Sequence, residues 1–506
     1  MRGILRPGPA LWCERPLAAA GLLVDGEDYY RAFYRAACQA RRYILIAGWQ
    51  FDSEVPLLRG EGAEAEAGGR PVTLRAFLSD LCERNPDLSI YLLAWDFHVV
   101  FALEREWLQQ LIFAWTTNER LSFRFDASHV ENGCHHQKFV VIDGELSFVG
   151  GLDICDHRWD DRRHREANPL RQSRGAPHKP FHDVQSYLVG RDVARALASL
   201  FDCRWQAAGG GPLSLPRGPR ASFGEDYRPP GALPLLAPRV ALSRTDPRGA
   251  PTDARGCREV YDLYREAIAA AERLIYVETQ YFSSRAIGEA LEARLRDPAR
   301  PPLDVVLILN MRAETLKEEI AVGLAQAKVL AGVRAAAAGT AHRLGIYYTV
   351  PEPAEAGREP ARATYIHSKV MAVDDLFLTV GSANLTNRSF SVDTELNASF
   401  EADGPGDPLA ASIAAARRSL LAEHLGLDDP EPDGALVPWL DDLAARRVGR
   451  LRPHPSPTER ETALLGVIDP SALPFDPDAA EDDEERRSFF AIGTGELWRR
   501  LFGDGE

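Results

Sequence analysis

HHQKFVVID at residues 135–143 and IHSKVMAVD at residues 366–374 are two copies of one pattern, H-x-K-x4-D. The apolar run inside each copy predicts a short buried strand, and alternate side chains of a strand share a face. The His and the Lys of each copy are two residues apart. We therefore expect them to point the same way in both copies, His136 with Lys138 and His367 with Lys369.

The pairing of imidazole with ammonium suits chemistry on a phosphate group. A histidine can act as nucleophile or acid near neutral pH, while a lysine offers three hydrogen-bond donors to anionic oxygens. A single copy is equally well explained by a core histidine followed by a snorkelling lysine. The chain contains only five lysines, however, and two of them lie in these motifs. The pair therefore favours a catalytic site over a structural one.

The aspartates that close the two motifs, Asp143 and Asp374, lie at an odd distance from their lysines. Strand parity places them on the opposite face, at the turn that ends the strand. We expect them to form hydrogen bonds at the strand end rather than to take part in chemistry.

The two motifs belong to a longer repeat. His136 and His367 are 231 residues apart, and the same offset superposes residues 42–51 on residues 273–282. Each of these segments is an apolar strand after an Ala-rich helical stretch. Two halves of the same plan, with an α/β fold in each, are the simplest explanation.

Three further segments make a family resemblance specific: GGLDIC at residues 150–155, GSANL at 381–385 and IYVETQYF at 275–282. Together with the two H-x-K-x4-D motifs they resemble the phospholipase D superfamily, in particular its eukaryotic-type branch, with Thr279 where that branch usually has Asn. The resemblance covers roughly residues 25–425. It implies two tandem α/β lobes, each a mixed sheet flanked by helices, related by a pseudo-twofold axis with the active site at their interface.

The resemblance also implies hydrolysis or transfer of a phosphodiester through a phosphohistidine. His136 is then expected to be the nucleophile and His367 the acid that protonates the leaving group. The groups expected to hold the non-bridging phosphate oxygens are Lys138, Lys369, Asn384, Gly150, Gly151 and Ser382. The first half has Asp153 where the second has Asn384, and a carboxylate beside a phosphate is unfavourable unless it points away or binds a choline-like cation.

A phosphate-attacking histidine needs an acceptor on its far ring nitrogen, which fixes the tautomer and stabilises the cation that forms. Asp183 and Glu395 follow the motifs on strand-like segments and could supply this acceptor. The resemblance supports this role, because these strands carry the supporting acid in the family. The alternative is that both are ordinary surface carboxylates.

The domain boundaries follow from composition. We expect a first lobe at residues 1–206, a Gly/Pro-rich connector at 207–238, a second lobe at 239–428 and an acidic, Pro-rich C-terminal extension at 429–506. The mixed-charge run at residues 156–164 predicts a solvated loop at the mouth of the site, with metal binding a minor alternative.

The net charge of −15 argues against a general nucleic-acid or anionic-membrane binder. Seven scattered cysteines without a C-x-x-C pair favour free buried thiols in a reducing compartment. No apolar run of membrane-spanning length occurs, which predicts a cytoplasmic protein. Richness in Ala, Arg and Pro suggests a bacterial genome. We expect a monomer without metal or cofactor.

The function expected from the resemblance is a phosphodiesterase of phospholipase D type that acts on the head group of a glycerophospholipid. Its partners would be a phospholipid at a transiently contacted membrane surface and a water or alcohol acceptor, with no stable nucleic-acid partner. The alternatives are a cardiolipin-synthase-like phosphatidyltransferase, an endonuclease of the same fold and, in a different class, a non-catalytic scaffold.

Overall fold

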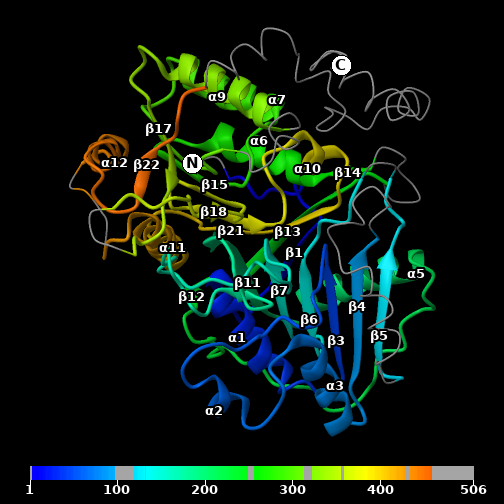
Figure 1. Cartoon of the computed structure of the whole chain (residues 1–506). Helices are drawn as coiled ribbons and strands as arrows, with labels where there is room; N and C mark the ends of the chain where they lie inside the picture. The colour runs from blue at the N-terminus through cyan, green and yellow to red at the C-terminus, as the bar shows by residue number, and fades with distance from the viewer. Residues whose placement is uncertain are drawn as a thin grey trace, which may run out of the picture.

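The computed structural model describes residues 3–96, 119–130, 133–248, 256–312, 322–354, 358–428, 432 and 434–457. Two large mixed sheets dominate it (Figure 1). The first sheet has the order β12 (Leu233–Leu235), β2 (Ala19–Val24), β11 (Val184–Val189), β7 (Leu146–Gly150), β6 (Phe139–Ile142), β3 (Tyr43–Gly48), β4 (Ser89–Trp95), β5 (Leu121–Asp126).

The second sheet has the order β1 (Cys13–Pro16), β13 (Arg239–Asp246), β21 (Glu395–Glu401), β20 (Phe377–Gly381), β19 (Val370–Val373), β15 (Leu274–Glu278), β16 (Asp304–Ile308), β17 (Arg343–Thr349), β22 (Leu451–Pro453), and β14 (Cys257–Arg258) pairs with β13. Two small sheets complete the strands: β10 (Phe181–His182) with β18 (Tyr365–Ile366), and β8 (Gln172–Ser173) with β9 (Ala176–Pro177).

The two large sheets repeat the same seven-strand plan. From β2 to β5 and from β13 to β17, the first four neighbouring pairs are antiparallel and the last two are parallel. The segments superposed by the 231-residue offset are β3 and β15, which occupy the same place in their sheets. The predicted α/β repeat is therefore confirmed, while the symmetry axis itself stays a prediction.

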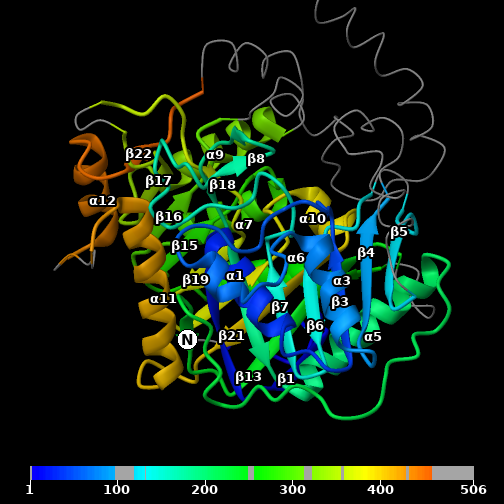
Figure 2. The same cartoon turned by 60° about the horizontal axis from the view of Figure 1, so that its bottom comes forward.

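Helices pack on the faces of both sheets. Those of the first half are α1 (Asp25–Ala37), α2 (Ala63–Ala67), α3 (Leu74–Arg84) and α5 (Arg191–Ala207). Those of the second half are α6 (Glu259–Ala270), α7 (Arg285–Arg296), α9 (Leu324–Ala337), α10 (Asn387–Ser391), α11 (Pro408–Leu425) and α12 (Leu436–Ala445). Figure 2 shows α1 and α3 in front of the first sheet. Apolar residues at helical spacing predict helices at 103–115 and near 313–335, and a short helix is also predicted at 494–502. The first and the last of these lie outside the described residues, as does the start of the second.

The apolar core has three parts, each tied to a sheet face. One cluster packs α1 and α3 against the first sheet, and another packs α6, α7 and α9 against the second. The third joins the inner faces of both sheets with α5 and α11, so the two lobes share a continuous core. The central strands β7, β11, β20 and β21 contact one another across this junction. The motif strands β6 and β19 are next to β7 and β20, which brings the two motifs toward the interface.

Three short strands connect regions that composition separated. β1, from the predicted first lobe, pairs with β13 of the second sheet. β12, from the predicted connector, pairs with β2, and β22, from the predicted extension, pairs with β17. The lobe boundaries themselves stay predictions. Backbone pairing at sheet edges is what the composition could not indicate, because any extended segment can supply it.

Candidate active site

Each motif places its His and Lys just before a buried strand rather than within it. His136 and Lys138 precede β6, and His367 and Lys369 precede β19. In both copies the lysine ammonium donates to the carbonyl oxygen of the motif histidine, at 3.0 Å for Lys138. The predicted strand therefore begins one residue after the lysine, and the side chains of each pair turn toward the lobe interface.

Each motif histidine is held by a carboxylate of the opposite lobe. The Nδ1 of His136 lies 3.0 Å from an oxygen of Glu395, and the Nδ1 of His367 lies 2.5 Å from Asp183. The backbone makes the same exchange, because the amide of His136 donates to Thr394 and that of His367 to His182. The two carboxylates expected from the sequence are thus buried, and each depends on both lobes being in place.

Burial disfavours the charged forms of both His–carboxylate pairs, His136 with Glu395 and His367 with Asp183. It raises the pKa of Asp183 to about 7 and that of Glu395 to about 8. Burial, assisted by Lys138 and Lys369, lowers the pKa of His136 well below its usual value. Burial followed by Lys369 and Arg158 does the same for His367. A neutral imidazole bonded through Nδ1 leaves Nε2 either free to attack or protonated to donate, depending on where the bridging proton sits.

The two lysines differ in their partners. The ammonium of Lys138 lies 3.3 Å from Asp153, whose other oxygen accepts a hydrogen bond from the amide of Trp49. The ammonium of Lys369 donates to the side-chain oxygen of Gln280 at 3.2 Å, an oxygen that Asn384 also contacts. The carboxylate of Asp153 therefore does not point away from the site, and its cationic partner is Lys138 rather than a choline-like group.

Three residues predicted to bind phosphate hold other groups instead. The amides of Gly150 and Gly151 donate to backbone carbonyls, and the hydroxyl of Ser382 donates to Glu395. A Cβ on Gly151 would lie 2.2 Å from an oxygen of Asp183, so the missing side chain lets that carboxylate approach. This corrects the expectation for the small pairs, which position Asp183 and Glu395. The phosphate role expected for the two lysines and Asn384 stays a prediction.

Asp143 and Asp374 lie where the parity argument predicts. Both have positive φ at the turn after the motif strand. The carboxylate of Asp143 accepts from the amides of Arg41, Arg42, Tyr43 and Ala221. That of Asp374 accepts from the amides of Glu272, Arg273 and Leu274. Each aspartate therefore ties the motif hairpin to the start of β3 or β15.

Comparisons with known proteins agree with this arrangement. A family model described as "Cardiolipin synthase, PLD-like domain" matches residues 264–414. Phospholipase D alpha 3 of Arabidopsis thaliana is 26% identical, and the match covers 78% of this chain and 63% of that protein. Phospholipase D alpha 1 of Oryza sativa subsp. japonica is 25% identical, with 80% and 65% covered. In both cases the match spans less than two thirds of the relative's own length.

The crystal structure of phosphatidylserine synthase from Haemophilus influenzae Rd KW20 has the same fold, with a TM-score of 0.52 at 13% identity, and the match covers 81% of this chain and 88% of that one. The chain belongs to the phospholipase D superfamily. Membership accounts for the duplicated sheets and for the two motifs at their junction. In the described part of the chain, no helix is long and apolar enough to cross a membrane.

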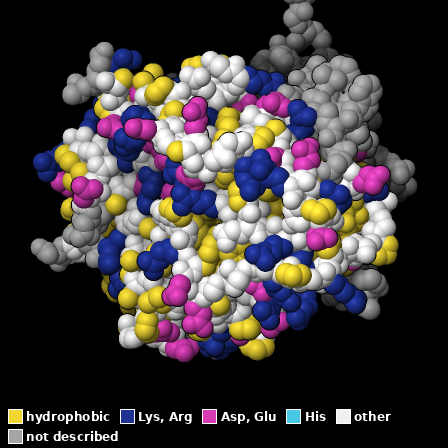
Figure 3. All heavy atoms as spheres, turned by 90° about the horizontal axis from the view of Figure 1, so that it is seen from below, with side chains coloured by type: hydrophobic (Ala, Val, Ile, Leu, Met, Phe, Trp, Pro, Cys, Tyr) yellow, Lys and Arg dark blue, Asp and Glu magenta, His cyan; other side chains and the backbone are white. Residues whose placement is uncertain are grey.

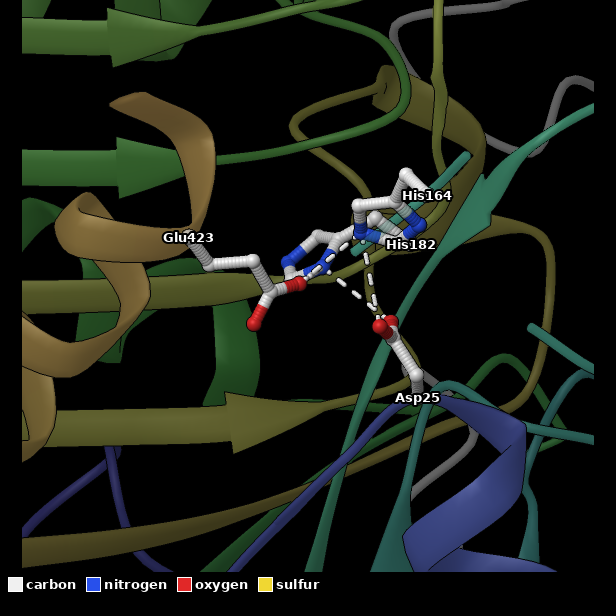
Figure 4. A group of neighbouring side chains, drawn as sticks. All are labelled: Asp25, His164, His182 and Glu423. Carbon is white, nitrogen blue, oxygen red and sulfur yellow. Dashed lines mark hydrogen bonds and ion pairs between the residues drawn. The ribbon is translucent and has the colours of Figure 1, made fainter. Parts of the chain in front are cut away.

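This member of the phospholipase D superfamily also contains a buried cluster beside Asp183 that the sequence did not reveal. His164 contacts Glu423 at 2.9 Å and Asp25 at 3.4 Å, and the Nδ1 of His182 contacts the same two carboxylates (Figure 4). Glu423 comes from α11 of the second lobe and Asp25 from the start of α1. The cluster therefore fastens the two lobes together.

The cluster corrects the prediction of a solvated loop at residues 156–164. Asp160, Asp161 and His164 are all buried, because the loop folds inward and its charges pair with one another. The Nδ1 of His164 contacts Asp160 at 3.0 Å, and Arg171 contacts the same carboxylate. Mixed-sign charge in sequence was compatible with such a buried network as well as with solvation.

Two groups of side chains have the spacing of metal ligands: Asp25, His164, His182 and Glu423, and also His182, Glu278 and His424. The atoms of the first group lie within 4.8 Å of one another. Burial opposes charge on His164, but Asp25, Asp160 and Glu423 outweigh it and raise its pKa to about 9. Glu423, Glu278 and Asp25 likewise raise the pKa of His182 well above its usual value. The raised pKa values favour charged imidazoles, which together with Arg162 and Arg171 would balance these carboxylates.

The sequence thus identified both His–Lys pairs and both carboxylates that contact the motif histidines, but it missed Gln280 and the buried cluster. Gln280 lies within the IYVETQYF segment, where only the family resemblance was noted. His182 immediately precedes Asp183, and that adjacency was the one signal available for it.

Proposed function

We propose that this protein is a phosphodiesterase of phospholipase D type, which hydrolyses the head-group phosphodiester of a glycerophospholipid or transfers it to an alcohol. The observation that carries the proposal is the crossed arrangement of two His–Lys pairs, each with a buried carboxylate from the other lobe on Nδ1. The resemblance to plant enzymes named phospholipase D alpha supports the substrate class.

In the first step, Nε2 of His136 attacks phosphorus while Nε2–H of His367 gives its proton to the leaving alkoxide. An N–P bond forms and the P–O bond to the head group breaks. In the second step, water or an alcohol attacks the phosphohistidine and loses its proton to His367, which restores both histidines. Glu395 and Asp183 hold the bridging protons that set the tautomers.

The phosphate oxygens are bound by fixed donors. Among the residues that the structure describes, Lys369 and Asn384 have only neutral hydrogen-bond partners, so both can turn to an anion without breaking an ion pair there. Lys138 is paired with Asp153, so part of its positive charge is already compensated before phosphate binds. Donors held in a buried site stabilise the charge that develops on the phosphate, because little reorganisation is needed at the moment of reaction.

Phosphatidyl transfer is the strongest second candidate. The family model that matches residues 264–414 is named for cardiolipin synthase. A transferase would use the same two steps, with a lipid alcohol in place of water. An endonuclease could use the same groups, but the net charge of −15 disfavours binding to the phosphates of a nucleic acid.

Contact with a membrane surface would be transient. Figure 3 shows Lys/Arg and Asp/Glu side chains interspersed over the face seen from below, with hydrophobic side chains scattered among them. A mixed surface of this kind favours brief docking over stable insertion. A cytoplasmic location, a monomeric state, a bacterial origin and the absence of a stable nucleic-acid partner are further parts of the proposal.

The test is a parallel assay of the purified protein on phosphatidylcholine, cardiolipin and single-stranded DNA, with the His136→Ala protein as control. We expect release of phosphatidate from phospholipid that the control lacks. With an added primary alcohol, the phosphatidyl ester of that alcohol should appear as well. Cleavage of DNA with no turnover of either lipid would refute the proposal.

A further inference from the structure

The wall beside His367 is made of two stacked aromatic rings from different lobes. Phe181 of β10 stacks on Tyr365 of β18, with ring centres 5.7 Å apart. The ring centre of His367 lies 5.2 Å from that of Phe181 and 6.4 Å from that of Tyr365. Because His367 is the proposed acid, this wall lies on the side where the leaving group departs.

A cationic side chain lies over each ring of the wall. The guanidinium carbon of Arg158 lies 5.1 Å from the centre of Phe181, and the ammonium of Lys179 lies 3.3 Å from the centre of Tyr365. Tyr365, Arg158 and Lys179 are partly exposed, so a bound molecule could reach all three. The hydroxyl of Tyr365 accepts from Gln280, which also contacts Lys369, so the wall is continuous with the phosphate donors.

Arg158 has no carboxylate within ion-pair distance among the described residues, and its Nε is buried without a hydrogen-bond partner. An arginine in a partly buried site normally pairs with an anion, because losing water around an unpaired charge is costly. Its position is fixed by the loop after β7, which Tyr30 holds by donating to the carbonyls of Asp153 and Cys155. A Cβ on Gly26 would come within 3.1 Å of the carbonyl oxygen of Arg158, so this loop lies directly against α1.

The charge around this wall excludes one common class of head group. A quaternary ammonium binds to open aromatic faces, yet the ring of Tyr365 is stacked on Phe181 and bears Lys179 at 3.3 Å. A choline head group would bring a third cation between Arg158 and Lys179. An anionic group would instead pair with both of them.

We propose that Arg158, assisted by Lys179, binds an anionic group carried by the leaving head group, so that the preferred substrate is a phosphodiester whose head group bears a carboxylate or a second phosphate. This inference rests on the proposed function and on His367 as the acid. The arginine fork offers two parallel donors to either anion, which a lysine at this position could not match.

The test compares short-chain, monomeric substrates, so that membrane charge plays no part. Phosphatidylserine differs from phosphatidylethanolamine by a carboxylate, and phosphatidylglycerol phosphate differs from phosphatidylglycerol by a phosphate. We expect kcat/KM to be higher for the anionic member of at least one pair by about tenfold or more, the usual worth of a hydrogen bond to a charged group. The pair that shows the preference identifies the anion.

Arg158→Gln should remove that preference, so that kcat/KM falls by about tenfold more for the anionic head group than for its matched neutral head group. Arg158→Lys should keep part of the preference, and Lys179→Gln should reduce it. Arg163→Gln is the matched control, because Arg163 lies on the same loop but its side chain is 66% exposed. Thermal melting of each variant separates loss of fold from loss of recognition.

Three outcomes decide the matter. A wild-type protein that turns over phospholipids without preferring either anionic substrate overturns this inference and leaves the proposed function standing. Equal loss on both members of a pair in Arg158→Gln would assign the guanidinium to the reacting phosphate instead, and also overturns it. A wild-type protein that turns over no phospholipid defeats the proposed function itself.

Discussion

The two half-sites share a backbone plan but differ in charge. In the first, Lys138 is neutralised by Asp153 and the side chain of His136 is 17% exposed. In the second, Lys369 has neutral partners and the side chain of His367 is 8% exposed. Duplication thus preserved the position of each His–Lys pair, while in the described part of the chain only the lysine of the first pair contacts a carboxylate. In addition to burial, Arg158 joins the lysines in lowering the pKa of His367, whereas at His136 Asp393 and Asp153 oppose them.

The surroundings behind the two histidines differ as well. Behind His136, the imidazole of His135 contacts Asp126, which is also paired with Arg204. Burial and Arg204 lower the pKa of His135 to about 3, so this neighbour stays neutral. Behind His367 lie His164 and His182, whose pKa values are raised by neighbouring carboxylates although burial opposes the charge. The carboxylates behind the second half-site therefore favour a charged imidazole, whereas burial behind the first disfavours one.

The largest expected effect separates the two histidines by the quality of the leaving group. His136→Ala should lose turnover of every substrate by more than about 100-fold, since no nucleophile remains. His367→Ala should lose as much on natural lipids, yet release a burst of about one equivalent of nitrophenol from a substrate with that leaving group, which needs little protonation, before the adduct on His136 stops turnover. Rapid-mixing measurements of nitrophenol release check this. A burst in His136→Ala instead would exchange the two roles.

A smaller effect concerns the buried cluster and pH. The folded-state pKa of His164 is raised to about 9, compared with about 6.5 in an unfolded chain. A raised pKa contributes stability that is complete below about pH 6.5 and is lost as the pH rises toward 9, by a few kcal/mol at most. Urea titrations should show this loss, with a shallower pH slope in His164→Gln. The exposed His157→Gln serves as control, and an unchanged slope in His164→Gln would rule out the protonated cluster.

The smallest expected effect concerns the aspartates that close the motifs. Asp374→Asn should lower the free energy of unfolding by about 1–3 kcal/mol, the cost of weakening its bonds to backbone amides. Asp143→Asn should cost more, because Asp143 is buried and binds four amides. Both proteins should keep near-normal kcat at a temperature where they are folded. A stable but inactive Asn variant would overturn the parity argument, and Asp87→Asn, on the surface, is the control.

Much of the fold could be predicted from the sequence because its signals are local. The motif runs predicted β6 and β19, and the 231-residue offset placed β3 and β15 in equivalent positions. The sequence of residues 121–126 also predicts a strand, and β5 has the same bounds. The edge strands β1, β12 and β22 were missed, because their pairing depends on partners far away in the chain rather than on their own side chains.

The sequence predicted the individual residues of the site but not which residues of the two lobes contact each other. His136 and Glu395 are 259 residues apart, as are His164 and Glu423, and no local pattern joins such residues. Asp183 and Glu395 were expected to support the histidines, but only the folded chain shows that each serves the motif of the other lobe. The phosphate role predicted for Gly150, Gly151 and Ser382 failed for the same reason, since their partners become visible only when the strands pair.

The central claim is that the two half-sites divide one reaction, with His136 as nucleophile and His367 as acid. Rapid base quenching during turnover of a slow lipid, followed by peptide mass spectrometry, tests it directly, because phosphohistidine survives in base. We expect a phosphatidyl adduct on His136 in the wild-type protein, more of it in His367→Ala with a nitrophenol leaving group, and none in His136→Ala. An adduct on His367 in the wild-type protein would contradict the assignment.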